Sequence, residues 1–147
     1  MPSRDALRRG RLLNCPFCRI ASHVEPAAMV YEDEALMAFM DKNPVTRGHL
    51  LVAPKAHYET LLDLDADLVS RLFVLVARVA KALWRALRPD GLNVLQNNRP
   101  VAWQSIPHVH VHLIPRYHGD GISVVWPARH KSLRELEEVA EEIRRAL

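Results

Sequence analysis

The residues best suited to chemistry are three histidines at every second position, in the segment His108-Val109-His110-Val111-His112. In a β-strand, alternate side chains face the same side, so the three imidazoles would form a row while the valines face the core. Burying aligned imidazoles is costly unless each ring has a hydrogen-bonding partner or a function. The pattern therefore favours a functional role over three ordinary core histidines.

Two kinds of chemistry suit such a row. Neighbouring histidines lie roughly 6.6 Å apart along a strand and the outer two roughly 13 Å apart. Because zinc–nitrogen bonds are only about 2 Å long, one metal ion would use at most two of the three rings. Neutral imidazole is also a nucleophile near pH 7, and flanking rings can bind phosphoryl oxygens and carry protons. We predict that His110, the middle ring, attacks phosphorus.

Hydrogen-bond donors for a phosphoryl group lie just upstream, at Asn97, Gln104 and Ser105. Such donors stabilise the charge that develops on phosphoryl oxygens when they are already in place. The sequence contains neither Gly-x-x-x-x-Gly-Lys nor Gly-x-Gly-x-x-Gly. A P-loop or a Rossmann nucleotide site is therefore not expected.

Cys15 and Cys18 form a Cys-x-x-Cys pair near the start of the chain. In a cytoplasmic protein such a pair is more typical of metal ligands or of a redox couple than of a structural disulfide. The βαβ context of a thioredoxin-like redox pair is missing here. The simpler alternative is two unligated small residues in the core.

The composition indicates a folded domain that would hold these residues in place. Hydrophobic residues make up 49% of the 147 residues and charged residues 25%, as in ordinary globular proteins. No apolar run is long enough to span a bilayer, and the basic segment Met1–Leu13 lacks the apolar core of a secretory signal. We expect a flexible basic arm over 1–13, a single domain over 14–147, a cytoplasmic location and no membrane partner.

The hydrophobic patterns predict an α+β domain with a mainly antiparallel sheet. A short helix is expected from Asn14 to about Ser22, and a C-terminal helix over Ser132–Leu147 with a capping box between Ser132 and Glu135. The long helix is expected over Asp65–Arg88. The strands are expected over Ala28–Tyr31, Ala35–Asp41, His49–Ala53, Leu92–Gln96 and Pro107–Pro115.

The predicted long helix has two faces of different character. Its apolar positions cover more than one narrow stripe, which predicts that a second subunit covers part of them. The net charge of +3 suits an anionic partner only mildly. We interpret its basic stripe as a solvated face and not as a nucleic-acid site, because no aromatic residues are interleaved with it. The stripe comprises Arg71, Arg78, Lys81, Arg85 and Arg88.

These segments together resemble the histidine triad (HIT) family, and the resemblance extends from Cys15 to Trp126. Gln104-Ser105 is closer to the Hint-like and bacterial branches of the family than to the Fhit branch. The motifs that carry the resemblance are Cys15-Pro-Phe-Cys18-Arg-Ile20, Val30-Tyr-Glu-Asp-Glu34, Phe39-Met-Asp41, Gly48-His49-Leu-Leu-Val-Ala-Pro-Lys55-Ala-His57, Gly91-Leu-Asn-Val-Leu-Gln-Asn97 and His108-Val-His-Val-His112-Leu-Ile-Pro-Arg116.

The resemblance implies a HIT-like fold, in which a five-stranded sheet carries one long helix and a C-terminal helix, and a homodimer. It implies a nucleotide hydrolase or nucleotidyl transferase that cleaves nucleoside 5'-phosphoramidates, or related nucleoside-α-phosphate substrates, through a nucleotidyl–His110 intermediate. The alternatives are a dinucleoside polyphosphate hydrolase or phosphorylase and a non-catalytic nucleotide-binding dimer that acts through its surface. The leaving group and the choice of base stay open.

Roles for single residues follow from the same resemblance. His110 would be the nucleophile and His112 would assist it. A purine nucleotide would contact Phe17 and Ile20 with its base, Asp41 with its ribose hydroxyls, and Asn97, Gln104, Ser105 and His112 with its phosphate or leaving group. A closed, structural Zn²⁺ site would consist of Cys15, Cys18, His57 and His108.

Two further positions stand out beside these motifs. Trp103 occupies a place where glycine is usual in the family, and it would narrow the leaving-group side of the site. We interpret the histidines outside the triad and the predicted metal site as residues without a catalytic or metal-binding role. His49 is the best placed of them to support the site from a neighbouring strand.

Overall fold

The computed structural model describes residues 14–123 and 126–147, and the predicted basic arm over 1–13 lies outside the described residues. The described part holds a five-stranded sheet in the order β1-β2-β3-β5-β4, in which every neighbouring pair is antiparallel. The predicted α+β class and antiparallel sheet are thereby confirmed. The strands are β1 (Met29–Glu32), β2 (Leu36–Met40), β3 (Leu50–Pro54), β4 (Gly91–Gln96) and β5 (Val111–Arg116).

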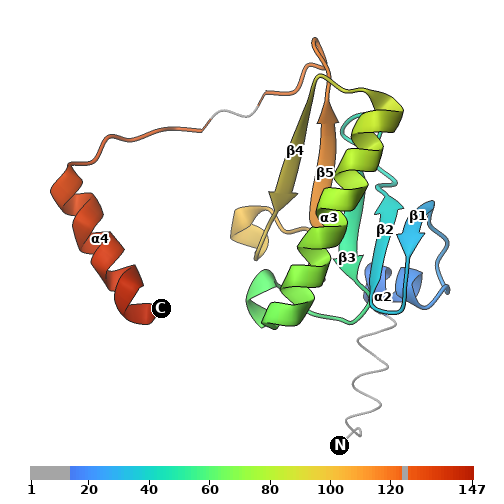
Figure 1. Ribbon diagram of the computed structural model, residues 1–147, viewed down its shortest axis with the longest axis horizontal. Coiled ribbons are helices and arrows are strands. Elements are labelled where there is room, and N and C mark those ends of the chain that lie inside the picture. Colours follow the sequence, from blue (N-terminus) through green and yellow to red (C-terminus); the bar gives the residue numbers. More distant parts are fainter. Residues whose placement is uncertain (1–13, 124–125) are drawn as a thin grey trace, which may run out of the picture.

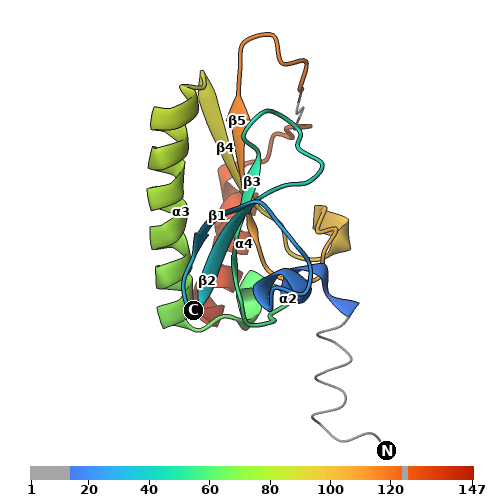
Figure 2. The same ribbon diagram turned by 90° about the vertical axis from the view of Figure 1, so that its right-hand side faces the viewer.

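The sheet separates the long helix from the short N-terminal helix, as Figures 1 and 2 show. α3 (Ala66–Leu87) crosses one face and α2 (Pro16–Ala21) lies on the other. Each helix packs on its own apolar cluster. The cluster under α3 includes Val52, Leu72, Leu75, Val76, Val79, Leu83, Val111 and Leu113. The cluster under α2 comprises Cys15, Phe17, Cys18, Ile20, Met37, Phe39, Leu51 and Ala53.

Most predicted element boundaries agree with the structure to within two residues, but the histidine strand does not. The strand predicted over Pro107–Pro115 begins only at Val111 and runs to Arg116. Pairing with β3 ends at Val52↔Val111, and the backbone N–H of Val109 donates to the carbonyl oxygen of Tyr58 instead of to a strand. His108 and His110 therefore lie in the segment that leads into β5.

Helix ends were predicted with mixed success. The N-cap of α2 is Cys15 and not the predicted Asn14, because the Cys15 thiolate or thiol sulfur accepts the backbone N–H of Cys18 at 3.4 Å. The predicted capping box of the C-terminal helix α4 (Leu133–Ala146) is confirmed, with Ser132 and Glu135 bonded reciprocally. Short 3₁₀ turns lie at Leu61–Asp63 and Pro100–Ala102.

Two helical surfaces carry exposed apolar side chains. α4 lies away from the sheet (Figure 1), and its apolar residues Leu133, Leu136, Val139 and Ile143 are all more than half exposed. On α3, Phe73, Val74 and Trp84 are exposed although the opposite side of the helix is buried. The sequence prediction that α3 carries more apolar surface than the sheet covers is confirmed.

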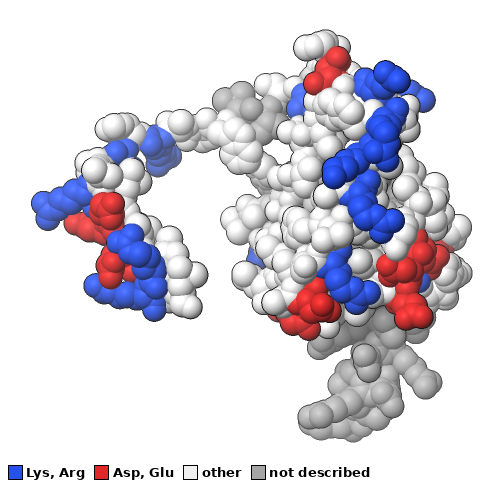
Figure 3. Space-filling view, in the orientation of Figure 1, with Lys and Arg blue, Asp and Glu red and all other residues white. Residues whose placement is uncertain are grey.

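The basic stripe of α3 is a solvent-exposed surface, as predicted. Figure 3 shows its Lys and Arg side chains as a band over α3. Arg78 also lies over the ring of Tyr31, with 5.4 Å between its guanidinium carbon and the ring centroid. Among the described residues, no helix combines the length and the apolar character needed to cross a membrane.

Gly48 fixes the turn that leads into β3, and its replacement offers a test of this packing. Its φ is +93°, and an added Cβ would overlap Leu87 of α3 and approach Pro115 Cγ to 3.1 Å. Gly48→Ala is expected to lower the free energy of unfolding by about 2–4 kcal/mol, from a positive φ and overpacking together. Urea denaturation measures the loss.

Gly119→Ala is the matched control for Gly48→Ala. Gly119 also has a positive φ, of +73°, but nothing lies within 4 Å of an added Cβ. Its loss should be limited to the backbone cost of about 1–2 kcal/mol. Equal losses in the two variants would contradict the packing of the turn against α3.

Candidate active site

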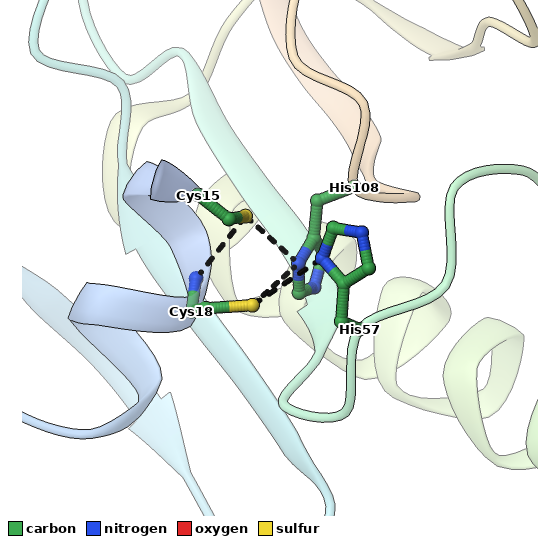
Figure 4. Close-up of side chains that lie close together, drawn as sticks. All are labelled: Cys15, Cys18, His57 and His108. Atoms are coloured by element: carbon green, nitrogen blue, oxygen red, sulfur yellow. Dashed lines mark hydrogen bonds between the residues drawn. The ribbon is translucent and has the colours of Figure 1, made fainter. Parts of the chain in front are cut away.

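Two thiols and two imidazoles meet on the α2 face of the sheet, as Figure 4 shows. Cys15 and Cys18 come from α2, His57 from the loop after β3, and His108 from the segment before β5. Cys18 Sγ lies 3.3 Å from His57 Nδ1 and 3.5 Å from His108 Nδ1, and Cys15 Sγ lies 3.4 Å from His108 Nδ1. All four candidate ligand atoms lie within 4.8 Å of one another.

This geometry suits a tetrahedral metal ion. With zinc–sulfur bonds of about 2.3 Å and zinc–nitrogen bonds of about 2.0–2.1 Å, tetrahedral angles place sulfur and nitrogen ligands about 3.6 Å apart. The observed separations of 3.3–3.5 Å are close to that value. The four residues therefore fit a Cys₂His₂ metal site.

The protonation of His108 also suits a ligand. Its Nε2–H donates to the carbonyl oxygen of Pro54 at 2.8 Å, which leaves the lone pair on Nδ1, the atom that faces both sulfurs. Burial lowers the pKa of His108 to about 4 and raises the pKa of the Cys18 thiol to about 12. The ring is therefore neutral near pH 7, and a cation at this place would favour the thiolate.

His110 has the protonation that a nucleophile needs. Its Nδ1–H donates to the backbone carbonyl oxygen of His108 at 2.6 Å, so the lone pair of the neutral ring is on Nε2. Burial lowers the pKa of His110, which opposes the effect of this hydrogen bond. The ring is 4% exposed and lies edge-on to Phe17, with 5.0 Å between the ring centroids.

A cavity of about 570 Å³ adjoins His110. Most of the predicted nucleotide-binding residues lie together on its wall, as does His110 itself. These are Phe17, Ile20, Asp41, Ser105 and His112. Sequence reasoning missed Lys42 and Asn43, which line the same cavity; their position directly after Asp41 was the available signal.

Two predicted phosphate ligands are not part of this wall. The Gln104 amide nitrogen donates to the carbonyl oxygen of Glu59 at 2.5 Å, and its amide oxygen accepts the backbone N–H of Arg99 at 2.7 Å. The Asn97 amide donates to the carbonyl oxygen of Trp103 at 3.5 Å. In this structure both side chains hold the loop between β4 and β5.

Trp103, at the position where the family resemblance implies glycine, adopts a left-handed backbone conformation. Its φ is +71°, which costs a residue with a Cβ about 1–2 kcal/mol. The side chain is 62% exposed and contacts the ring of Trp126 at a centroid distance of 5.8 Å. Trp103 is not among the residues that line the 570 Å³ cavity, so the predicted narrowing does not affect that cavity.

His49 joins His112 and Asp41 in a second cluster beside His110. His49 Nε2 lies 2.9 Å from His112 Nδ1 and 3.5 Å from Asp41 Oδ2. Burial is the main cause that lowers the pKa of both histidines, in the case of His112 to about 4. Both rings are therefore expected to be neutral near pH 7.

Comparison with known proteins agrees with this geometry. A family model described as HIT domain matches residues 22–119. The crystal structure of a HIT family member from Bacillus subtilis is 40% identical with a TM-score of 0.86, over 91% of this chain and 97% of that one. Adenosine 5'-monophosphoramidase from Schizosaccharomyces pombe is 36% identical over 132 residues, 89% of this chain and 96% of that protein.

A further similar solved structure is described as zinc-bound. It is a zinc-bound histidine triad family protein from Mycobacterium smegmatis, with 36% identity and a TM-score of 0.71 over 92% of this chain and 99% of that one. The family model covers more than half of the chain, and the matched relatives span most of it. The chain therefore belongs to the HIT family.

Proposed function

We propose that the protein is a nucleotide hydrolase or nucleotidyl transferase that cleaves nucleoside 5'-phosphoramidates or related nucleoside-α-phosphate substrates. The observation that carries the proposal is the hydrogen bond from His110 Nδ1–H to the His108 carbonyl oxygen. It leaves a neutral nucleophilic nitrogen on a residue that lines a cavity large enough for a nucleotide. The name of the Schizosaccharomyces pombe relative supports the phosphoramidate class.

The reaction proceeds in two displacements at the α-phosphorus. His110 Nε2 donates its lone pair to phosphorus while the bond to the leaving amine breaks and the amine takes up a proton. Water then attacks the nucleotidyl–His110 phosphorus, loses a proton, and the phosphorus–nitrogen electron pair returns to Nε2. In the intermediate the His110 ring is cationic, and the His108 carbonyl oxygen stabilises it through Nδ1–H.

Different residues on the cavity wall contact different parts of the nucleotide. Phe17 and Ile20 contact the purine base, and Asp41 accepts hydrogen bonds from the ribose hydroxyls. Ser105 and His112 contact the α-phosphate or the leaving group, next to His110. Asp41 has acceptor capacity for this role, because a carboxylate has about four acceptor sites and the Asn43 backbone N–H, at 2.8 Å from Oδ1, takes one of them.

Asn97 and Gln104 reach the phosphate or the leaving group only after a local change. In the structure their amide groups bond to the carbonyl oxygens of Trp103 and Glu59. A substrate oxygen would have to replace those carbonyls as the acceptor. This exchange would couple substrate binding to the loop that also carries Ser105.

The Cys₂His₂ cluster holds a structural Zn²⁺. Four protein ligands leave no open coordination position, and a closed site of this kind stabilises a fold without activating water. The zinc-bound Mycobacterium smegmatis relative supports the choice of metal. The ion would link Cys15 and Cys18, at the start of α2, to two histidines. These are His57 in the loop after β3 and His108 in the segment before β5.

Covalent catalysis is tested by replacing His110. His110→Ala should abolish turnover and leave the fold largely intact, because loss of the nucleophile removes the pathway. His112→Ala should lower the rate by about 10²–10³, the usual cost of one positioned donor. Rapid-quench mass spectrometry with an adenosine phosphoramidate should find a nucleotidyl adduct on the peptide that contains His110.

Two results would contradict covalent catalysis by His110. One is an active His110→Ala enzyme. The other is inversion of configuration at a chiral α-phosphorus, because two displacements retain configuration and a single attack by water inverts it. A panel with a phosphoramidate and a dinucleoside polyphosphate separates the preferred substrate class from the alternative one, and no turnover of either would favour a non-catalytic nucleotide-binding protein.

The proposed zinc site is tested by metal analysis. Protein purified without chelator should contain about one zinc per chain, the content of a single four-ligand site. Cys18→Ser should lose most of the metal and melt at a lower temperature. His23→Gln is the control, since that exposed histidine is outside the cluster. Metal-free protein with an unchanged melting temperature would contradict a structural zinc.

We also predict a homodimer built partly on α3. Phe73 and Trp84 are exposed and eleven residues apart, which places them on the same side of the helix. Light scattering at low micromolar concentration should give the mass of a dimer, and Trp84→Glu should shift it toward the monomer. Val24→Glu, at another exposed apolar residue, should not. A monomer mass for the wild type would remove the proposal.

A further inference from the structure

An apolar groove of about 320 Å³ runs between α3 and β1, on the face of the sheet that α3 covers. Val30 and Tyr31 of β1 line one side, and Leu75 and Val79 of α3 line the other. The groove shares no lining residue with the nucleotide cavity, which lies on the α2 face. An exposed apolar hollow of this kind is typical of a surface on which another segment of chain packs.

Three cations line the same groove from α3. Arg78, Lys81 and Arg85 are all exposed, and they belong to the basic band that Figure 3 shows over α3. In the part of the chain that the structure describes, none of the three is in an ion pair. The groove therefore combines an apolar floor with a positively charged rim. It suits an amphipathic helix with acidic borders.

α4 has this character. Its five glutamates and three arginines leave a net charge of −2. At 3.6 residues per turn, Glu135 and Glu142 follow one border of its apolar stripe and Glu137 follows the other. A helix of 14 residues is marginal in water by itself, so the exposed stripe needs a surface that covers it. The stripe has the spacing of one helix face and comprises Leu133, Leu136, Val139 and Ile143.

The path of the chain takes α4 away from its own groove. α4 lies beyond β4 (Figure 1), whereas the groove borders β1, at the opposite edge of the sheet. Phe73 is two residues from Leu75, and so about 160° away around the helix axis. The exposed Phe73 and Trp84 therefore face away from the groove, toward the β4 side. A partner subunit that packs on them would lie on the same side as α4.

We propose that α4 of each subunit packs in the α3–β1 groove of the other subunit. In a two-fold dimer the exchange is reciprocal, so both grooves and both apolar stripes become buried. The stripe of α4 packs on the apolar floor, and the glutamates at its borders approach the cations of the rim. The inference rests on the homodimer proposed above and not on the nucleotide chemistry.

Photo-cross-linking tests where the stripe packs. The amino acid p-benzoylphenylalanine replaces Ile143 in the full zinc-loaded chain, and in a control variant it replaces Glu138 on the opposite side of α4. Irradiation of the Ile143 variant at low micromolar concentration should give a covalent dimer on a denaturing gel. Peptide mapping of that band should place the second attachment point on β1 or on residues 75–85 of α3. The Glu138 variant should give little covalent dimer.

The role of the rim is tested by Lys81→Glu against Arg47→Glu. Both variants change the net charge equally at an exposed position, but only Lys81 lines the groove. Sedimentation equilibrium should show the dissociation constant of the Lys81→Glu dimer raised about 10-fold, because each dimer exchanges two attractions for two repulsions. The dissociation constant of the Arg47→Glu dimer should stay close to that of the wild type.

A cross-link at the monomer mass would overturn the exchange, because α4 would then occupy the groove of its own chain. A covalent dimer joined from α4 to α4, or the absence of any cross-link from Ile143, would also overturn it. Equal dissociation constants for the two charge variants would contradict the pairing with the rim. A monomeric wild type would contradict the homodimer too, whereas a cross-link within one chain of a dimeric protein contradicts the exchange alone.

Discussion

The site depends on one hydrogen bond, from His110 Nδ1–H to the carbonyl oxygen of His108. It settles which nitrogen of the proposed nucleophile has the lone pair, and it supplies the acceptor for a cationic ring. His108 itself is fixed through its side chain, by Pro54 and by the two thiols. One residue therefore belongs to two centres: its ring to the candidate metal site and its carbonyl group to the nucleophile.

Each histidine of the triad commits one ring nitrogen to a protein partner, which leaves the other nitrogen for a metal ion in the case of His108 and for a substrate in the case of His110 and His112. His108 gives Nε2 to a carbonyl oxygen of β3, His110 gives Nδ1 to the carbonyl oxygen of His108, and His112 gives Nδ1 to His49. Buried imidazoles need such partners, and among the described residues no buried side-chain nitrogen or oxygen is without one. The partners that satisfy the rings also select their tautomers, so folding and function use the same bonds.

The elements followed from local patterns in the sequence, and most of the predicted nucleotide-binding residues lie on the cavity wall. Alternation located the triad, and periodicity located α3 almost to the residue. Hydrogen bonds between segments that are far apart in the sequence could not be predicted from such local patterns. The carbonyl oxygen of Tyr58 accepts the Val109 N–H, so strand pairing does not extend to that residue. The carbonyl oxygen of Glu59 accepts the Gln104 amide N–H. His49 contacts His112, which is 63 residues away in the sequence. The spacing of residues in the sequence does not say which group a ring nitrogen will contact. The tautomers of the three histidines could therefore not be predicted.

α2 links the candidate metal site to the candidate nucleotide site. A helix of six residues is too short to be stable alone, because isolated helices below about 12–15 residues are marginal in water. Between its two cysteines lies Phe17, whose ring contacts both His108 and His110 and also lines the cavity. A metal that holds both thiols therefore also holds the wall against which the base would stack. Structural zinc would in this way shape the nucleotide site without taking part in the chemistry.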